Sequence, residues 1–278
     1  MELWPVAGVS GLQLRNQLQE VARSAFNASG AQGGPDEVVR AYLTWVDDAT
    51  RRLRPLLRAD DFKHLIQTDR YWATLGTSNR MAIWQSTLAE LDFLSTRLEE
   101  AHMSVTRRLE RWEVAHAGER TFVCIVVDTN VFMAYPTTFA SMNWAEQLRV
   151  PFGDLAAVRI AIPMLVVDEL DSVKRDKDRD NARLALKTIY DLIGANPRQR
   201  AVLPATELNC GELSVELIFD PPRHNRLSVA DDELIDRAVA LQSFINHKVE
   251  FVTYDTGAAL RAAAAGLSAH RLEHERRK

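Results

Sequence analysis

From about residue 117 onward, short apolar runs typical of strands alternate with segments of helical periodicity. Strands that are separated by helices connect through right-handed crossovers, so this alternation predicts a mainly parallel sheet covered by helices. The expected strands are 122–127, 158–162, 214–219, 250–254 and a short last one at 268–272. The expected helices are 141–150, 164–174, 180–194, 229–246 and 256–265. The pattern predicts an α/β domain over residues 117–278, with a hairpin or excursion within 204–228.

The preceding residues show no strand alternation and have a helical pattern throughout. Apolar residues recur at helical spacing over 38–49 and again over 79–115, and Pro35 stands where a helix would begin. Five of the six tryptophans fall in this segment, where core packing and base stacking are alternative roles. Residues 1–116 are therefore expected to form a separate, all-α helical bundle domain.

The composition is that of a globular chain, with 46% hydrophobic and 26% charged residues and a formal net charge of −4. No apolar run is long enough to cross a membrane, and the N-terminus lacks the basic and apolar regions of a signal peptide. The two cysteines, Cys124 and Cys210, do not form a disulfide framework. A cytoplasmic location without membrane contact is therefore expected.

Four carboxylates fall where a doubly wound sheet would gather them. Asp128 and Asp255 each follow a strand-like run, and Glu169 and Asp231 lie in or near the first turns of expected helices. The C-terminal ends of parallel strands and the following helix N-termini share one edge of such a sheet. Like charges packed together destabilise a fold unless a cation joins them, and oxygen ligands suit a hard ion such as Mg²⁺ or Mn²⁺. The four acids predict a divalent-metal site that acts on phosphate.

Each of these acids also has a purely structural explanation. Asp128 and Asp255 stand where a helix N-cap would stand, and Glu169 taken alone is an ordinary charge at a helix edge. Thr129 and Asn130 are either groups that orient the Asp128 carboxylate or plain turn residues. Independent caps have no reason to converge, so the joint placement at one sheet edge favours a metal site.

The third acid is ambiguous in two ways. Ser228 and Asp231 resemble a capping box, with aspartate in place of the usual glutamate or glutamine. Asp231 also shares a helical stripe with Leu234, which is expected to pack inward. Asp232 lies one position round the helix and remains the substitute for Asp231 as a ligand.

Four segments together resemble the PIN-domain nuclease family over roughly residues 121–273. They are DTN at 128–130, PMLVVDELD at 163–171, SVADDELI at 228–235 and VTYD at 252–255. The resemblance implies a Rossmann-like three-layer α/β/α domain that cleaves RNA or single-stranded nucleic acid with Mg²⁺ or Mn²⁺. Matched by position, the catalytic and metal-binding acids would be Asp128, Glu169, Asp231 and Asp255, with Asn130 and Thr256 as supporting polar groups.

The chain departs from the family pattern at Ala230, where an asparagine is frequent, and this leaves the choice between Asp231 and Asp232 open. The helical segment 1–116 lies outside the family core and speaks against the compact PIN toxins. Family members often dimerise, so a homodimer is the assembly that the resemblance implies. Basic stretches at 51–58, 107–111 and 174–183 would guide a phosphate backbone or form ordinary solvated helix surfaces.

Three function classes follow from these features. The leading hypothesis is a metal-dependent PIN-type endoribonuclease, and the alternative is a non-catalytic PIN scaffold that binds RNA or a protein. A phosphatase with Asp128 as nucleophile would place a second aspartate where Asn130 stands. The histidines and cysteines lack zinc-site spacing, and neither a glycine-rich phosphate loop nor a G-x-S-x-G nucleophile elbow occurs.

Overall fold

The computed structural model divides the chain into two compact units, Met1–Glu113 and Val114–Lys278. It describes residues 3–30, 33–112, 121–149, 155–173, 179–194, 200–203, 212–220, 224–245 and 247–273. The predicted domain boundary between residues 116 and 117 lies outside these ranges and stays a prediction. Among the described residues, none of the helices combines the length and apolar composition that a membrane crossing requires.

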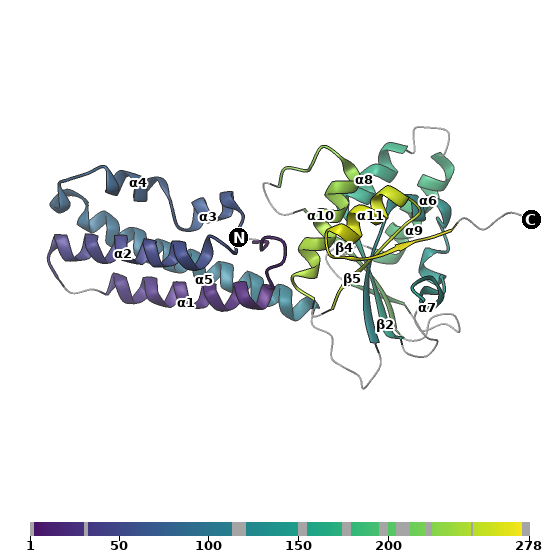
Figure 1. The fold of residues 1–278 in the computed structure, drawn as a ribbon, viewed down its shortest axis with the longest axis horizontal. Helices are drawn as coiled ribbons and strands as arrows, with labels where there is room; N and C mark the ends of the chain where they lie inside the picture. Colours follow the sequence, from purple (N-terminus) through teal and green to yellow (C-terminus); the bar gives the residue numbers. More distant parts are fainter. Residues whose placement is uncertain are drawn as a thin grey trace, which may run out of the picture. The chain divides into compact units, whose positions relative to one another are not determined.

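The first unit is built from helices alone (Figure 1). They are α1 (Gly11–Ser29), α2 (Pro35–Leu53), α3 (Ala59–Leu65), α4 (Asp69–Leu75) and α5 (Arg80–Trp112). Side chains at the starts explain the boundaries: Ser10 accepts from the Gln13 amide at 3.1 Å, and Thr68 accepts from the Tyr71 amide at 3.4 Å. The expectation of a helical N-terminal region is confirmed.

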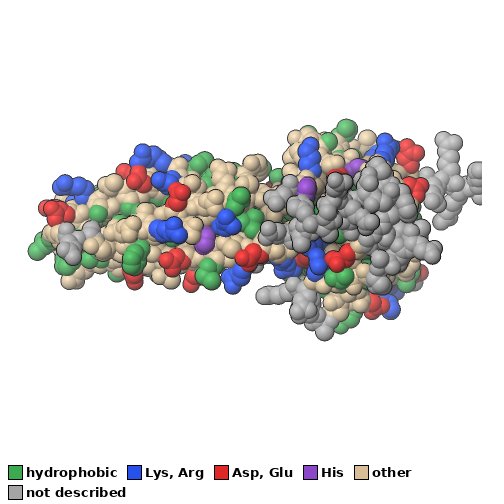
Figure 2. Space-filling view, turned by 90° about the horizontal axis from the view of Figure 1, so that it is seen from below, with side chains coloured by type: hydrophobic (Ala, Val, Ile, Leu, Met, Phe, Trp, Pro, Cys, Tyr) green, Lys and Arg blue, Asp and Glu red, His purple; other side chains and the backbone are tan. Residues whose placement is uncertain are grey.

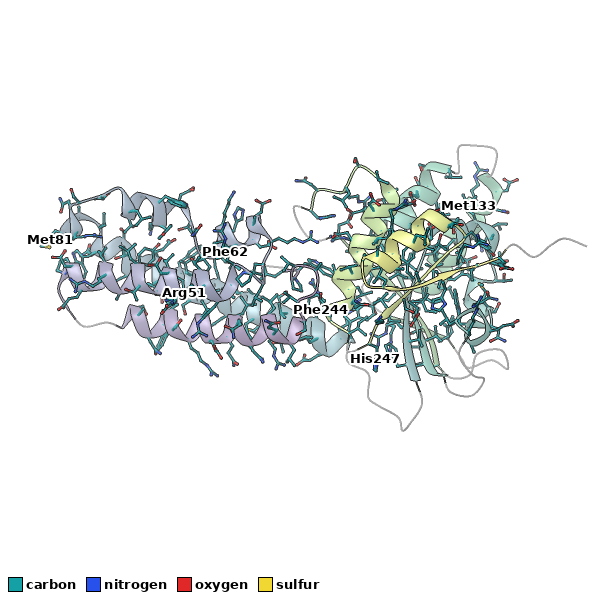
Figure 3. The ribbon with its side chains drawn as sticks, viewed as in Figure 1. Arg51, Phe62, Met81, Met133, Phe244 and His247 are labelled. Carbon is teal, nitrogen blue, oxygen red and sulfur yellow. The ribbon has the colours of Figure 1, made fainter. Side chains whose placement is uncertain are left out.

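Apolar stripes of these helices pack on one another and form the core of the unit. Phe62 of α3, labelled in Figure 3, is buried together with Leu14 of α1 and Val46 of α2. Trp4, Trp45 and Trp112 are buried as core residues, whereas Trp72 is 56% exposed, and these burials fit the core-packing role for most of the tryptophans in this unit.

The surface of the helical unit mixes charges of both signs. On the face seen in Figure 2, Lys and Arg side chains are interspersed with Asp and Glu side chains. Within the predicted basic stretch 51–58, Arg51 pairs with Asp48, and Arg52 pairs with Glu20 at 2.5 Å. These two arginines are thus already neutralised by carboxylates of their own unit.

The second unit contains a six-stranded sheet in the order β3-β4-β2-β1-β5-β6. All strand pairs are parallel except β3 with β4. The strands are β1 (Thr121–Val127), β2 (Leu155–Pro163), β3 (Ala201–Leu203), β4 (Glu212–Ile218), β5 (Val249–Thr253) and β6 (Ser268–Arg271). The near-continuous apolar sequence of β1 fits its central place, where both faces of the strand are covered.

Helices lie on both faces of this sheet (Figure 1). They are α6 (Thr129–Ala134), α7 (Trp144–Gln147), α8 (Met164–Val173), α9 (Arg179–Ile193), α10 (Ala230–Gln242) and α11 (Thr256–Ala264). The chain steps outward from β1 to β2 and β4, and then returns past β1 to β5 and β6. With right-handed crossovers, this reversal places α6–α9 on one face and α10 and α11 on the other. The predicted three-layer α/β/α architecture is confirmed.

The reversal of strand order fixes where a site can form. The strands on either side of the reversal are β1 and β5, which pair through Cys124–Val127 and Val249–Val252. In open α/β sheets, the crevice at the carboxyl ends of such strands is the usual ligand site. Asp128 and Asp255 follow these two strands directly.

One local expectation was wrong, and two short elements were not predicted. The predicted helix over 141–150 is reduced to a 3₁₀ turn (Phe139–Ser141) and the four residues of α7. Asn143 caps the start of α7 by accepting from the Glu146 amide at 3.3 Å, and Arg149, with a left-handed φ of 56°, does not continue the helix. The short helix α6 was not predicted. The strand β3 was also not predicted; it pairs antiparallel with β4, and residues 204–211 and 221–223 of the segment expected to form a hairpin or excursion lie outside the described residues.

Candidate metal centre

Asp128 lies at the junction of β1 and α6, and its carboxylate is turned toward β5. The main chain is fixed by the Asp128 amide, which donates to the carbonyl of Val252 at 2.9 Å. The side chain is 6% exposed, and Oδ2 accepts from Thr253 Oγ1 at 2.5 Å and from Asn130 Nδ2 at 2.7 Å. Although Asp128 occupies the N-cap position of α6, its side chain makes no capping hydrogen bond. The capping explanation therefore does not account for this residue.

Asn130 and Thr253 form a polar bridge between the ends of β1 and β5. The side-chain nitrogen of Asn130, Nδ2, donates to Thr253 Oγ1 at 3.1 Å, and the side-chain oxygen Oδ1 accepts from the backbone amide of Tyr254 at 3.2 Å. Thr253 also accepts from the Asp255 amide at 2.9 Å. This network holds the Asp128 carboxylate in one orientation. Sequence reasoning identified Asn130 but missed Thr253, whose position follows from the β1–β5 register that pairs Val127 with Val252.

Negative charge accumulates around Asp128. The pKa of the Asp128 carboxyl is raised from 3.8 to about 6, chiefly by burial and also by the nearby charges of Asp231 and Glu169, against hydrogen bonds from Thr253 and Asn130 that lower it. Asp128, Glu169 and Asp231 come from three different segments, yet they interact electrostatically. A carboxylate in this position is stabilised by a cation.

Glu169 reaches the cluster from α8 and is held there by α6. Its Oε2 accepts a hydrogen bond from the Thr129 hydroxyl, and both residues are at least half-buried. Thr129 thus orients Glu169, whereas Asn130 orients Asp128. The helix α6 is itself tied to α9, because Asn181 donates to the carbonyl of Met133 at 3.1 Å (Met133 is labelled in Figure 3).

Asp231 and Asp232 lie in the first turn of α10 and share one arginine of α11. Arg261 Nη2 is 2.6 Å from Asp231 Oδ2, and its Nε is 3.1 Å from Asp232 Oδ1. Their side chains are 40% and 44% exposed, so Asp231 does not point into the core as its helical stripe predicts. The N-cap of α10 is Val229, without a side-chain cap, and the expected capping box is absent at this start. Of the two acids, Asp231 is the one that raises the pKa of Asp128.

Asp255 has a different environment. Its Oδ1 accepts from the Ala258 amide at 2.7 Å, so it caps α11, and the residue is exposed. The charges named above as raising the pKa of Asp128 come from Asp231 and Glu169 and not from Asp255. Thr256, predicted as a supporting group, accepts from Arg271 Nη1 at 3.0 Å. The structure gives Asp255 a capping role, and its role as a metal ligand stays a prediction.

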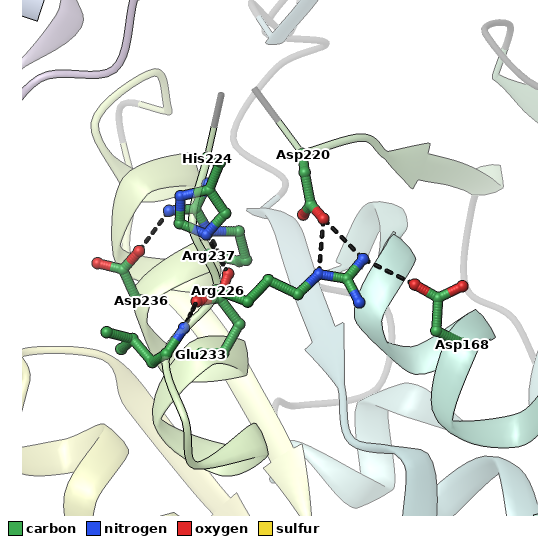
Figure 4. A network of polar contacts seen from close by, with 8 residues as sticks. Asp168, Asp220, His224, Arg226, Glu233, Asp236 and Arg237 are labelled. Atoms are coloured by element: carbon green, nitrogen blue, oxygen red, sulfur yellow. Dashed lines mark hydrogen bonds and ion pairs between the residues drawn. The ribbon is translucent and has the colours of Figure 1, made fainter. Parts of the chain in front are cut away.

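A second cluster of possible ligands is formed by His224 with Glu233 and Asp236 of α10, the helix that also carries Asp231 (Figure 4). Glu233 is 0% exposed and lies 2.6 Å from His224 Nε2 and 3.2 Å from Arg237 Nε, while Asp236 also pairs with Arg237. The second carboxylate oxygen of Glu233, Oε2, accepts from the backbone amide of Leu227 at 2.9 Å. Because the Arg237 guanidinium already supplies the cation, this cluster does not fit a metal ion and is better explained as a structural clamp.

The clamp continues to α8 through Arg226. Its guanidinium lies 2.6 Å from Asp220 and 2.7 Å from Asp168, the residue before Glu169 (Figure 4). The segment 224–227 thereby links the start of α10 to α8, which are the elements that carry Asp231 and Glu169. Sequence reasoning missed Glu233, Arg237 and Arg226, because charged residues on a helix or loop are normally assigned to the surface.

The first cluster offers the donor chemistry that a hard divalent ion prefers. Its donors are carboxylate oxygens, its inner member is buried with a raised pKa, and threonine and asparagine side chains fix two of the three acids. Among the described residues, the three-residue group whose ligand atoms all lie within 4.8 Å of one another is the second cluster, so Asp128, Glu169 and Asp231 would share an ion by moving closer together or by binding it through water. The family model for the PIN domain matches residues 125–273, which include every acid of the first cluster. No curated protein matches the chain.

Proposed function

Since the chain belongs to the PIN-domain family, whose members are generally nucleases, we propose that it is a divalent-metal-dependent endoribonuclease that hydrolyses phosphodiester bonds of RNA or of other single-stranded nucleic acid. The observation that carries the proposal is the state of Asp128. Its carboxylate is buried, is not used as a helix cap and keeps a raised pKa beside Asp231 and Glu169. Perturbed acids of this kind gather at functional sites.

In this proposal the residues have distinct roles. Asp128, Glu169 and Asp231 hold one or two Mg²⁺ or Mn²⁺ ions, because Mg²⁺ keeps several waters and needs only two or three direct carboxylates. Thr129, Asn130 and Thr253 orient the first two acids. Asp232 and Asp255 lie at the rim of the site and act through water or through their contacts with α11.

The reaction is the attack of a water on the phosphorus atom in line with the leaving oxygen. The new bond joins the water oxygen to phosphorus, the bond from phosphorus to the 3′ oxygen breaks, and the products carry a 5′-phosphate and a 3′-hydroxyl. A bound divalent ion would lower the pKa of the attacking water and neutralise charge on the phosphate oxygens. The carboxylates of the chain would hold the ion at the point of the sheet edge where the strand order reverses.

A cleavage assay with a matched variant tests this function. Wild-type protein is incubated with labelled single-stranded RNA and single-stranded DNA, with Mg²⁺ or Mn²⁺ and with EDTA. The variants are Asp128→Asn and the control Asp191→Asn, since Asp191 is an exposed residue of α9 that pairs with Lys187. We expect metal-dependent cleavage by the wild type and the control and none by Asp128→Asn, with 5′-phosphate ends on the products.

Two results would count against the proposal. Cleavage by Asp128→Asn at the wild-type rate would remove Asp128 from the site. Binding of single-stranded RNA by the wild type without cleavage under any divalent ion would favour the non-catalytic scaffold instead.

A further inference from the structure

Arg261 of α11 supplies a positive charge at the rim of the acidic cluster, although this residue was not among the predicted site residues. Its guanidinium contacts Asp231 at 2.6 Å through Nη2 and Asp232 at 3.1 Å through Nε. Two different nitrogens thus bind two neighbouring carboxylates of α10. This two-pronged contact fixes the plane of the guanidinium, which a lysine at this position would not achieve.

The fold of α11 leaves a space for this group. Arg261 belongs to the last turn of the helix, but its side chain runs back toward the first turn, as long helical side chains generally do. A Cβ atom at Gly257 would lie 3.3 Å from Arg261 Nη1 and 3.1 Å from Asp255 Oδ1. A side chain at residue 257 would therefore crowd both groups, and glycine leaves the guanidinium room to reach α10.

Arg261 contacts the two acids at the rim, Asp231 and Asp232. The carboxylates of Asp128 and Glu169 accept hydrogen bonds from the neutral side chains of Thr253, Asn130 and Thr129, which bring no positive charge to them. A divalent ion bound between Asp128 and Asp231 would share Asp231 with Arg261, and two positive charges at one carboxylate repel each other. The Arg261 side chain is 46% exposed, so it is free to turn toward solvent at the rim where a phosphate backbone would arrive.

We propose that Arg261 exchanges partners: it binds Asp231 and Asp232 when the site lacks a divalent ion, and it binds a substrate phosphate when the ion takes Asp231. This inference rests on the proposed function, because it assumes the same metal site. Planar guanidinium groups suit both carboxylate and phosphate oxygens, so one side chain serves both states. Arg261 then limits metal binding in the absence of substrate and strengthens substrate binding in the presence of metal.

Binding measurements separate this role from a purely structural one. Mn²⁺ affinity is measured by the electron paramagnetic resonance signal of free Mn²⁺, for wild type, Arg261→Gln, Arg261→Lys and the control Arg200→Gln. Arg200 pairs with Glu212 at 3.2 Å at the start of β4, at the amino ends of the parallel strands and thus opposite to the carboxyl ends that carry the acids. Binding of a labelled single-stranded RNA is followed by fluorescence anisotropy with Ca²⁺, and a gel checks that the RNA remains intact.

We expect Arg261→Gln to bind Mn²⁺ about fivefold more tightly than the wild type, because an exposed ion pair that competes for Asp231 is gone. The same variant should bind the RNA about tenfold more weakly, because a charge-assisted phosphate contact is lost. Arg261→Lys should lie between wild type and Arg261→Gln in both measurements, and Arg200→Gln should match the wild type. A residue that only stabilised the fold would weaken Mn²⁺ binding when replaced.

The inference is overturned if Arg261→Gln, with an unchanged melting temperature, binds Mn²⁺ no more tightly than the wild type or binds RNA equally well. A wild type that binds Mn²⁺ and cleaves RNA alongside such a variant would leave the proposed function intact. If neither the wild type nor Arg261→Gln binds Mn²⁺, both proposals fail together.

Discussion

Thr129 donates its hydroxyl hydrogen to Glu169, across the gap between α6 and α8. The contact joins Thr129, which directly follows Asp128, to Glu169 of α8, the helix that follows β2. Two of the three inner carboxylates are thus positioned by consecutive residues, since Asn130 binds Asp128. Helix caps that lay close together by coincidence would not be expected to have their carboxylates oriented by two consecutive residues.

Replacing Thr129 with valine should weaken metal binding without unfolding the protein. Valine keeps the shape of the side chain but cannot orient Glu169, and loss of such outer contacts costs roughly 10- to 100-fold in metal affinity. Isothermal titration with Mn²⁺ measures the effect. Thr188→Val on the exposed face of α9, where the hydroxyl only contacts the Leu184 carbonyl, is the matched control and should bind like the wild type. Equal affinities for the two variants would remove Thr129 from the site.

Asp128 should destabilise the metal-free protein at neutral pH. Its folded-state pKa of about 6 lies above the usual 3.8, so the folded state holds the proton more tightly. The tighter proton binding of Asp128 in the folded state adds to the free energy of unfolding. This stabilisation is complete below pH 3.8, falls as the pH rises from 3.8 to about 6, and is lost above about pH 6. Asp128→Asn, whose amide oxygen can accept the same two hydrogen bonds, should therefore be more stable at pH 7 by up to about 3 kcal/mol.

Urea unfolding in EDTA at pH 4 and at pH 7 measures this difference, which should shrink at the lower pH. Added Mn²⁺ should raise the stability of the wild type and not that of Asp128→Asn, because only the former binds the ion. A variant that is less stable than the wild type at both pH values would contradict the electrostatic explanation.

Substitutions at Asp255 distinguish a cap from a ligand. Asp255→Ala removes the acceptor for the Ala258 amide and should destabilise the protein by about 1 kcal/mol, whereas Asp255→Asn retains an acceptor and should cost less. On the observed geometry, both variants should bind Mn²⁺ within about threefold of the wild type, as expected for a screened charge at the rim. Loss of Mn²⁺ binding by Asp255→Asn would instead restore the role that the sequence predicts.

The clamp around Glu233 should be essential for folding. Glu233→Gln leaves the buried guanidinium of Arg237 with less compensating charge, and breaking such a buried pair costs about 3 kcal/mol or more. Arg226→Gln, which breaks more exposed contacts with Asp168 and Asp220, should cost less than about 1 kcal/mol. Denaturant midpoints of the two variants provide the comparison, and similar losses would show that the clamp is not a buried ion pair in solution.

The sheet was predictable because its strands are apolar runs of ordinary length separated by clear helices. All five expected strands are present, and the placement of Asp128, Glu169 and Asp231 around one sheet edge follows from parallel topology alone. The six residues of α6 were missed because they are too few to show a helical period. The shortening of the 141–150 helix depends on the Asn143 cap at its start and on the left-handed backbone of Arg149 after its end, neither of which hydrophobic periodicity indicates.

The charged contacts around the site were the least predictable part. The helical stripe of α10 placed Asp231 inward, yet the buried acid is Glu233, because His224 and Arg237 are positioned to bind it. Arg261 reaches Asp231 from a helix that begins 25 residues after it in sequence. Such pairs depend on how distant helices pack, and a single sequence contains no signal for them.

Within the part of the chain that the structure describes, the strands at both borders of the sheet are very short, with three residues in β3 and four in β6. A second copy of the chain that paired its backbone with either border would find few amide and carbonyl groups to bind, so strand-to-strand addition is a poor route to self-association. If the homodimer implied by the family resemblance forms, its contacts should come from helix side chains, and its stability should respond to mutations on helix surfaces rather than to mutations in the outermost strands.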